Sequence, residues 1–173
     1  MMKIETERLY IRHFVNEDAS ICFEGWGTDE HLDDFIMGYP MNMDQMNSFV
    51  NAMVKNTNAW LIVEKESGAC IGYISFDIPY QELRIGEIGY VIGEKWHGKG
   101  YGTEAVKKMI SEYLSKDRLY LIEAKCNIDN KPSLNLLEKV GFIKDGVLRK
   151  RRIDKNTGEY RDLVVYSITT NDK

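Results

Sequence analysis

The sequence predicts a mixed α/β fold in a single domain spanning residues 1–173, with a mixed sheet of about seven strands flanked by about four helices. Two kinds of apolar pattern support this prediction: alternation with a period of two residues, typical of strands, and repeats at helical spacing. No Pro/Gly/Ser-rich linker, internal repeat or low-complexity tract interrupts the chain, so no domain boundary is predicted. The apolar fraction of 43% is enough to build a sizeable core.

The first part of the chain predicts one strand and two helices. Residues 8–14 alternate apolar and polar side chains in the manner of a strand. Asn16 to Asp18 can cap a helix that follows this strand. A second helix is predicted over residues 43–55, where apolar side chains recur at helical spacing.

Three strands follow, and the first two read as a β-hairpin. Short apolar runs at 59–63 and 70–78 flank the polar turn KESG. A further strand at 84–92 contains Gly86 and Gly89. Glycine inside a strand often marks a bulge or a position where another backbone or a ligand approaches closely.

The rest of the chain predicts two helices and three strands. The helix over 100–116 gathers its apolar residues on one face, which predicts packing against the sheet. A shorter helix over 131–140 begins after Asn130, has Pro132 in its first turn and ends before Gly141. The strand–helix–strand unit around the longer helix is expected to be a right-handed parallel crossover. The remaining strands are predicted at 119–124, about 142–153 and 161–169.

Charge and cysteine content exclude several classes of protein. The net charge of −4 argues against a nucleic-acid partner, because such proteins normally carry a basic surface. Cys22, Cys70 and Cys126 form no CxxC pair, so neither a disulfide framework nor a metal site is expected, in keeping with a reducing cytosol. The polar N-terminus and the absence of a long apolar run predict a cytoplasmic protein that does not span a membrane.

A glycine-rich loop precedes the longest predicted helix. It reads His97-Gly98-Lys99-Gly100-Tyr101-Gly102. Glycines at alternate positions let the backbone approach a ligand, and N–H groups at a helix N-terminus can bind phosphate oxygens. His97 and Lys99 can add positive charge. The loop lacks the Walker A and GxGxxG patterns, and a tight turn without a ligand is the alternative interpretation.

Five segments follow the order of one known family. They are Glu5-Thr6-Glu7-Arg8-Leu9 with Arg12; Glu87-Ile88-Gly89-Tyr90; HGKGYGTEA from His97; Asn130-Lys131-Pro132-Ser133 with Leu137 and Gly141-Phe142; and Tyr160-Arg161-Asp162 before VVYSI. Together they resemble the GCN5-related N-acetyltransferases, and within them the RimJ/RimL-like branch that acetylates ribosomal proteins. His97 departs from the family pattern, in which Arg or Gln is usual at that position.

The resemblance implies acetyl-CoA as cosubstrate and an amine as acceptor, with direct transfer inside a ternary complex. In the family's fold the central strands of the sheet splay apart. The pantetheine arm pairs with the exposed edge of one strand, much as a peptide adds to a sheet edge. The residues implied to bind the cofactor are Tyr90, Val91, Ile92, His97, Gly98, Lys99, Gly100, Tyr101, Gly102, Thr103, Asn130 and Ser133.

Glu87 is the candidate general base. An amine is protonated at neutral pH, so a base or a chain of water molecules must remove its proton before it attacks the thioester. Glu87 lies on the central strand, near where the two strands part in the family's fold. It can also orient a water molecule or the substrate ammonium. The alternatives are a solvated strand carboxylate and one paired with Arg84.

The short helix after Asn130 carries the other candidates. Asn130 is a good N-cap, and the resemblance adds a contact with the pantetheine arm. Ser133 is the second catalytic candidate, facing the thioester sulfur, with a solvent-facing serine as the alternative. Many relatives place a Tyr four residues later, where it protonates the leaving thiolate, but this chain has Leu137. Ser133 or water can take that part, and Cys126 reads as a strand residue, so no acyl-enzyme is expected.

The sequence leaves the acceptor and the assembly state open. The branch resemblance favours a protein N-terminal α-amine, but the same scaffold serves polyamines, amino sugars and antibiotics. A non-catalytic CoA-binding module and an RNA adaptor are the alternatives from other classes. Both a monomer and a homodimer fit the sequence. The basic run Arg149 to Arg152 is predicted to be a solvated strand face. His13 and His31 are predicted to be isolated, without partners for a metal or a catalytic triad.

Overall fold

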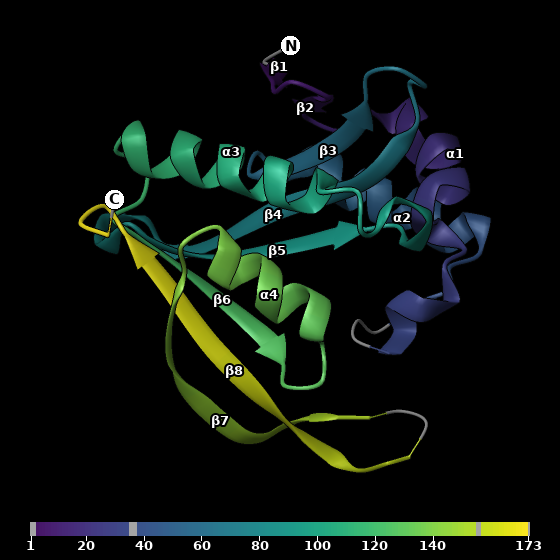
Figure 1. Ribbon diagram of the computed structural model, residues 1–173. Coiled ribbons are helices and arrows are strands. Elements are labelled where there is room, and N and C mark those ends of the chain that lie inside the picture. The colour runs from purple at the N-terminus through teal and green to yellow at the C-terminus, as the bar shows by residue number, and fades with distance from the viewer. Residues whose placement is uncertain (1–2, 35–37, 155–156, 173) are drawn as a thin grey trace. The chain divides into compact units, whose positions relative to one another are not determined.

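A computed structural model describes residues 3–34, 38–154 and 157–172 (Figure 1). Within them it has eight strands and four α-helices, which confirms the mixed α/β fold. The α-helices are α1 (Ala19–Cys22), α2 (Met43–Lys55), α3 (Tyr101–Ser115) and α4 (Lys131–Lys139). The strands are β1 (Lys3–Glu5), β2 (Leu9–Arg12), β3 (Ala59–Glu64), β4 (Cys70–Tyr80), β5 (Ile85–Ile92), β6 (Leu121–Asn127), β7 (Ile143–Ile153) and β8 (Tyr160–Thr169).

The strands join one sheet, in which hydrogen-bonded neighbours follow the order β1-β2-β3-β4-β5-β6-β8-β7. The strand that the sequence did not predict is β1, whose three residues pair antiparallel with β2. The chain divides into two compact units. The first comprises the chain up to Phe76 together with Tyr90–Ala105, and the second comprises Asp77–Gly89 together with the chain from Val106.

In the first unit, strands β1 to β4 pair antiparallel in chain order. α2 begins at a reciprocal cap, because the Asn42 side chain accepts from the Gln45 N–H at 2.9 Å and the Gln45 side chain accepts from the Asn42 N–H at 2.8 Å. Met46 and Val50 on its inner face are buried against the sheet. The core also includes Phe14, Cys22, Trp26, Leu61 and Cys70.

The predicted first helix is divided into three short turns. Asn16–Asp18 form a 3-10 turn, α1 follows, and Phe23–Gly27 form a π-helical turn. Asp18 does not cap a long helix. Its buried carboxylate accepts from the Val15 N–H at 2.8 Å and pairs with Arg12 at 2.6 Å, which fixes the start of the turn.

In the second unit, β5 pairs parallel with β6, and β6 pairs antiparallel with β8. The parallel pair confirms the orientation predicted for the strand–helix–strand unit. The β5–β6 ladder runs over three residue pairs, from Ile85↔Leu121 to Glu87↔Glu123. β6 continues beyond the ladder to Asn127, still paired with β8. The second unit therefore has a β5–β6 ladder that ends at Glu87.

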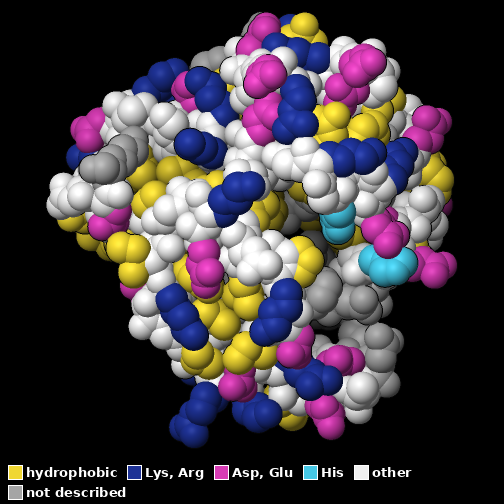
Figure 2. All heavy atoms as spheres, viewed as in Figure 1, with side chains coloured by type: hydrophobic (Ala, Val, Ile, Leu, Met, Phe, Trp, Pro, Cys, Tyr) yellow, Lys and Arg dark blue, Asp and Glu magenta, His cyan; other side chains and the backbone are white. Residues whose placement is uncertain are grey.

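The outer strand β7 is largely exposed. Its register with β8 shifts between Leu148 and Arg152, where Lys150 has a φ of 56°. Figure 2 shows basic and hydrophobic side chains together at the lower end of the view, where Figure 1 places β7 and β8. The run from Arg149 to Arg152 thus lies on a solvated strand, as predicted. None of the helices in the described part of the chain has the length and apolar character needed to cross a membrane.

Candidate functional site

The glycine-rich loop lies in the first unit, between the end of β5 and the start of α3. A 3-10 turn, Glu94–Trp96, leads into it. Gly98 has a φ of +71° and Gly100 a φ of +82°, in the left-handed region that favours glycine over residues with a Cβ. Gly102 already lies in the first turn of α3. The path of the loop therefore depends on the first two glycines.

The loop delivers the N-terminus of a long helix. α3 has 15 residues, and its first N–H groups have no carbonyl one turn earlier within the helix. Among them, the Glu104 N–H donates to the Gly100 carbonyl at 3.0 Å. The first turn also contains the small residues Gly102 and Thr103. Such a helix start can bind a phosphate through backbone N–H groups and the helix dipole.

His97 holds the loop to the end of the strand. Its Nε2 lies 2.7 Å from the Ile92 carbonyl oxygen, to which it donates a hydrogen bond. The Lys99 ammonium lies 5.1 Å from the centre of the Trp96 ring, within range of a cation–π contact. The ring of His97 thus shapes the turn, while Lys99 carries the exposed positive charge.

Glu87 lies in the second unit and is paired with Lys125, not with Arg84. The Lys125 ammonium forms an ion pair with the Glu87 carboxylate and lies 3.9 Å from the Glu123 carboxylate. Arg84 instead pairs with Asp117, so the predicted alternative of an Arg84–Glu87 pair is wrong. The hydrogen bond to Glu87 raises the pKa of Lys125 against the effect of burial. A permanent positive charge therefore accompanies Glu87 at neutral pH.

Asn130 caps α4, as the sequence predicts. Its side-chain oxygen accepts from the Ser133 N–H at 3.1 Å. Leu137 is buried in the core, with 1% of its surface exposed. The Cys126 thiol lies 3.8 Å from the Asn130 carbonyl oxygen, and burial raises its pKa against a hydrogen bond with Ser133. A thiol held protonated is a poor nucleophile.

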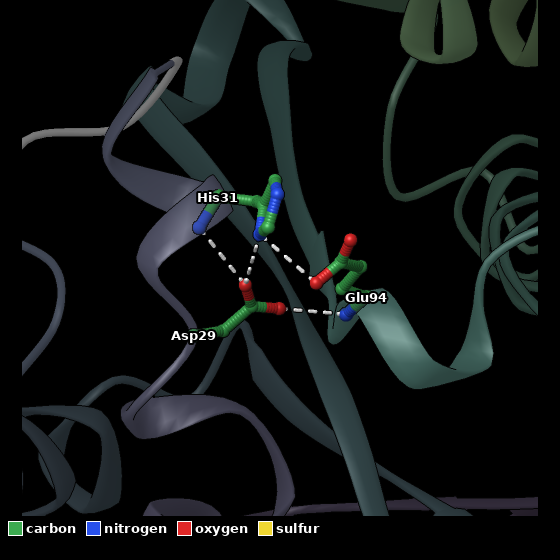
Figure 3. A group of neighbouring side chains, drawn as sticks. All are labelled: Asp29, His31 and Glu94. Carbon is green, nitrogen blue, oxygen red and sulfur yellow. Dashed lines mark hydrogen bonds and ion pairs between the residues drawn. The ribbon is translucent and has the colours of Figure 1, made fainter.

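A cluster of three polar residues corrects the prediction that His31 is isolated (Figure 3). His31 Nδ1 lies 2.9 Å from a carboxylate oxygen of Glu94. Asp29 accepts from the His31 N–H at 3.1 Å and from the Glu94 N–H at 2.6 Å. The cluster joins the 3-10 segment Glu30–Asp34 to the turn that leads into the glycine loop. His31 Nδ1 also lies 3.8 Å from an Asp29 carboxylate oxygen, so both carboxylates face the same ring nitrogen.

The residues predicted for the site fall into two groups. Tyr90, Val91 and Ile92 share the first unit with the loop, whereas Glu87, Asn130 and Ser133 belong to the second. Gly72 lets β4 approach the first group closely, because a Cβ there would lie 2.0 Å from the Val91 carbonyl oxygen. The sequence did not predict that Arg8 contacts the loop, or that Thr6 and Arg8 both bond to Glu104. Thr6 and Arg8 belong to the first of the five family-like segments, and that resemblance is the sequence feature that could have identified them as site residues.

Comparisons with known proteins place the chain in a family. A family described as an acetyltransferase (GNAT) domain matches residues 8–143. The uncharacterized N-acetyltransferase p20 of Bacillus licheniformis is 31% identical, over 97% of this chain and 96% of its own length. The ribosomal protein uS5-alanine N-acetyltransferase of Escherichia coli is 25% identical, over 99% of this chain and 92% of its own. The crystal structure of a GNAT-family acetyltransferase from Bacillus anthracis has a TM-score of 0.87 at 27% identity, covering 98% of this chain and 99% of its own.

Proposed function

The chain belongs to the GNAT acetyltransferase family, and we propose that it acetylates the N-terminal α-amine of a protein. Acetyl-CoA-dependent transfer to an amine is the activity of this family, so the chain is an N-acetyltransferase with acetyl-CoA as cosubstrate. The observation that carries the choice of acceptor is the similarity to the uS5-alanine N-acetyltransferase, which extends over 99% of this chain. The proposal takes residues 1–173 as one catalytic domain that acts in the cytoplasm, where ribosomal proteins are made.

The glycine loop is proposed to bind the pyrophosphate of acetyl-CoA. Its support is the pair of left-handed glycines that leads to the start of α3. His97 holds the turn, and Lys99 supplies positive charge near the phosphates. Gly98, Gly100, Tyr101, Gly102 and Thr103 complete the binding loop.

The pantetheine arm is proposed to follow β5 beyond Glu87. The β5–β6 ladder ends at that residue, and Tyr90, Val91 and Ile92 continue the strand. Amide groups of the arm can then bond to the strand backbone as an added strand does. Asn130, whose side chain already caps α4, is proposed to bind the arm as well.

Glu87 is proposed to accept the proton of the acceptor ammonium, directly or through a water molecule. The neutral nitrogen attacks the thioester carbonyl carbon, the carbon–sulfur bond breaks and the thiolate leaves. Lys125 keeps a positive charge beside the Glu87 carboxylate. Ser133 or a water molecule is proposed to supply the proton to the thiolate, because Leu137 is a core residue and offers none. That donor takes up in return the second proton, which the nitrogen loses as the amide forms.

The acceptor is tested with a panel of amines under saturating acetyl-CoA. We expect turnover with peptides that carry a free N-terminal alanine or serine, and none with the same peptides blocked at the N-terminus. Release of free CoA measures the rate, and mass spectrometry locates the acetyl group on the α-amine rather than on a lysine. Turnover confined to polyamines, amino sugars or antibiotics would assign the protein a small-molecule acceptor instead.

Direct transfer predicts that Cys126→Ala retains most of the wild-type activity. The Cys126 thiol is buried and held protonated, so no covalent acetyl-cysteine is expected. The substitution removes a buried sulfur and is expected to cost about 1 kcal/mol of stability. kcat is measured well below the thermal midpoint of the variant. Loss of turnover in a folded Cys126→Ala protein would point to an acyl-enzyme.

A further inference from the structure

Arg8 contacts the glycine loop although it lies 91 residues before Lys99 in the chain. It lies between β1 and β2, yet its Nη1 donates to the Lys99 carbonyl at 2.9 Å. Its guanidinium also lies 4.4 Å from the centre of the Tyr101 ring. Its Nη2 is 3.4 Å from the place where a Cβ on Gly100 would stand. One side chain therefore contacts Lys99 and Tyr101 and occupies the space beside Gly100 between them.

Glu104 fixes Arg8 in this position. Arg8 Nε and Nη2 both lie 2.7 Å from one oxygen of the Glu104 carboxylate. The other oxygen accepts from the Arg8 N–H at 2.9 Å and from the Thr6 hydroxyl at 2.6 Å. Burial acts to raise the pKa of Glu104, but these hydrogen bonds outweigh it and the pKa is lowered. Both carboxylate oxygens of Glu104 are hydrogen-bonded, and these bonds restrict the conformations open to the Arg8 side chain.

We propose that Arg8 is a positioning residue for the phosphate end of acetyl-CoA. A trans peptide is planar, so the Lys99 carbonyl and the Gly100 N–H point in opposite directions. When Arg8 holds the carbonyl, it directs the Gly100 N–H away from itself, to the other side of the loop. Because Glu104 neutralises the guanidinium, Arg8 acts through the orientation of this peptide more than through its charge. The inference rests on the proposed role of the loop in binding pyrophosphate.

The fork geometry of Arg8 predicts that lysine cannot replace it. A lysine keeps the positive charge but cannot bond to Glu104 and the Lys99 carbonyl at once through a planar group. Arg8→Lys is therefore expected to raise the KM for acetyl-CoA by about tenfold with little change in kcat, as the loss of one well-placed charged hydrogen bond would do. The matched control is Arg12→Lys, because Arg12 pairs with buried Asp18 in the same N-terminal segment.

The second donor in the experiment is S-acetylpantetheine, which carries the same thioester and arm but lacks the phosphates. Arg8→Lys is expected to leave its kcat/KM unchanged, so that only the advantage of acetyl-CoA is lost. A merely structural role of Arg8 would lower turnover with both donors together. An equal loss with both donors, or an unchanged KM for acetyl-CoA, would overturn the proposal.

Titration with coenzyme A alone separates this proposal from the choice of acceptor. Calorimetry without any amine is expected to give about tenfold weaker binding in Arg8→Lys and wild-type binding in Arg12→Lys. Equal affinity in wild type and Arg8→Lys would reject the positioning role. Failure of every amine in the acceptor panel, with the affinity difference intact, would instead reject only the proposed acceptor.

Discussion

Acetyl-CoA is expected to raise the thermal midpoint of the wild-type protein and to leave that of Gly100→Asp unchanged. Ligand at a hundred times its dissociation constant adds about 2.7 kcal/mol to the stability of the state that binds it. For a chain of this size that corresponds to a rise of roughly 5–10 °C. Asp at position 100 would place a Cβ in the left-handed region, 3.4 Å from Arg8 Nη2, and would add a negative charge to the proposed phosphate-binding loop. Differential scanning fluorimetry with and without acetyl-CoA measures both proteins.

Gly68→Asp is the matched control for this experiment. Gly68 has a φ of +70°, close to the +82° of Gly100, and a Cβ there would meet no atom within 4 Å. The same side chain at a similar positive φ thus introduces a comparable strain away from the loop. We expect Gly68→Asp to have a lower midpoint than the wild type but the full rise with acetyl-CoA. A full rise in Gly100→Asp, or none in Gly68→Asp, would contradict the assignment of the loop.

Elements with strong local signals were predicted well from the sequence. α2 covers Met43–Lys55, the predicted range, because Asn42 caps it and the apolar residues keep helical spacing. β1 was missed because three residues are too few to show a period, and its pairing with β2 supplies what its own sequence lacks. The sequence predicts one continuous first helix, whereas the structure has three short turns there. A Cβ on Gly25 would lie 2.0 Å from the Cys70 carbonyl oxygen, so close packing against β4 competes with a continuous helix there.

In the candidate site, features that depend on a few neighbouring residues could be predicted, and contacts between residues far apart in the chain could not. The glycine loop and the Asn130 cap could be predicted, because each is a pattern within a few residues. The partners of these groups could not. Glu104 lies 96 residues from Arg8, and Lys125 lies 38 residues from Glu87. The Glu87–Lys125 pair depends on the register of two strands, and the Arg8–Glu104 pair depends on where α3 meets the N-terminal segment. One sequence specifies both only through the whole fold.

Glu87→Gln is expected to lower kcat by roughly 10²–10⁴, the range that a general base contributes. Gln keeps the size of the side chain and a hydrogen-bond acceptor for Lys125, but it cannot take a proton at neutral pH. Binding of acetyl-CoA is expected to stay intact, because the proposed phosphate contacts lie on the glycine loop. Stopped assays of CoA release measure kcat, and the thermal shift with acetyl-CoA measures binding in the same preparation.

Glu123→Gln separates the chemistry of Glu87 from the electrostatics around it. Glu123 is the residue paired with Glu87 in the β5–β6 ladder, and its carboxylate lies 3.9 Å from the same Lys125 ammonium. Each substitution therefore removes one negative charge from the β5–β6 pair, beside the Lys125 ammonium. Glu123→Gln is expected to keep turnover near the wild-type rate, since Glu123 is not proposed to take the amine proton. Equal losses in both variants would mean that the charge around Lys125 matters and that Glu87 has no special part as a base. Unchanged turnover in Glu87→Gln would mean that water or another group, and not Glu87, accepts the amine proton.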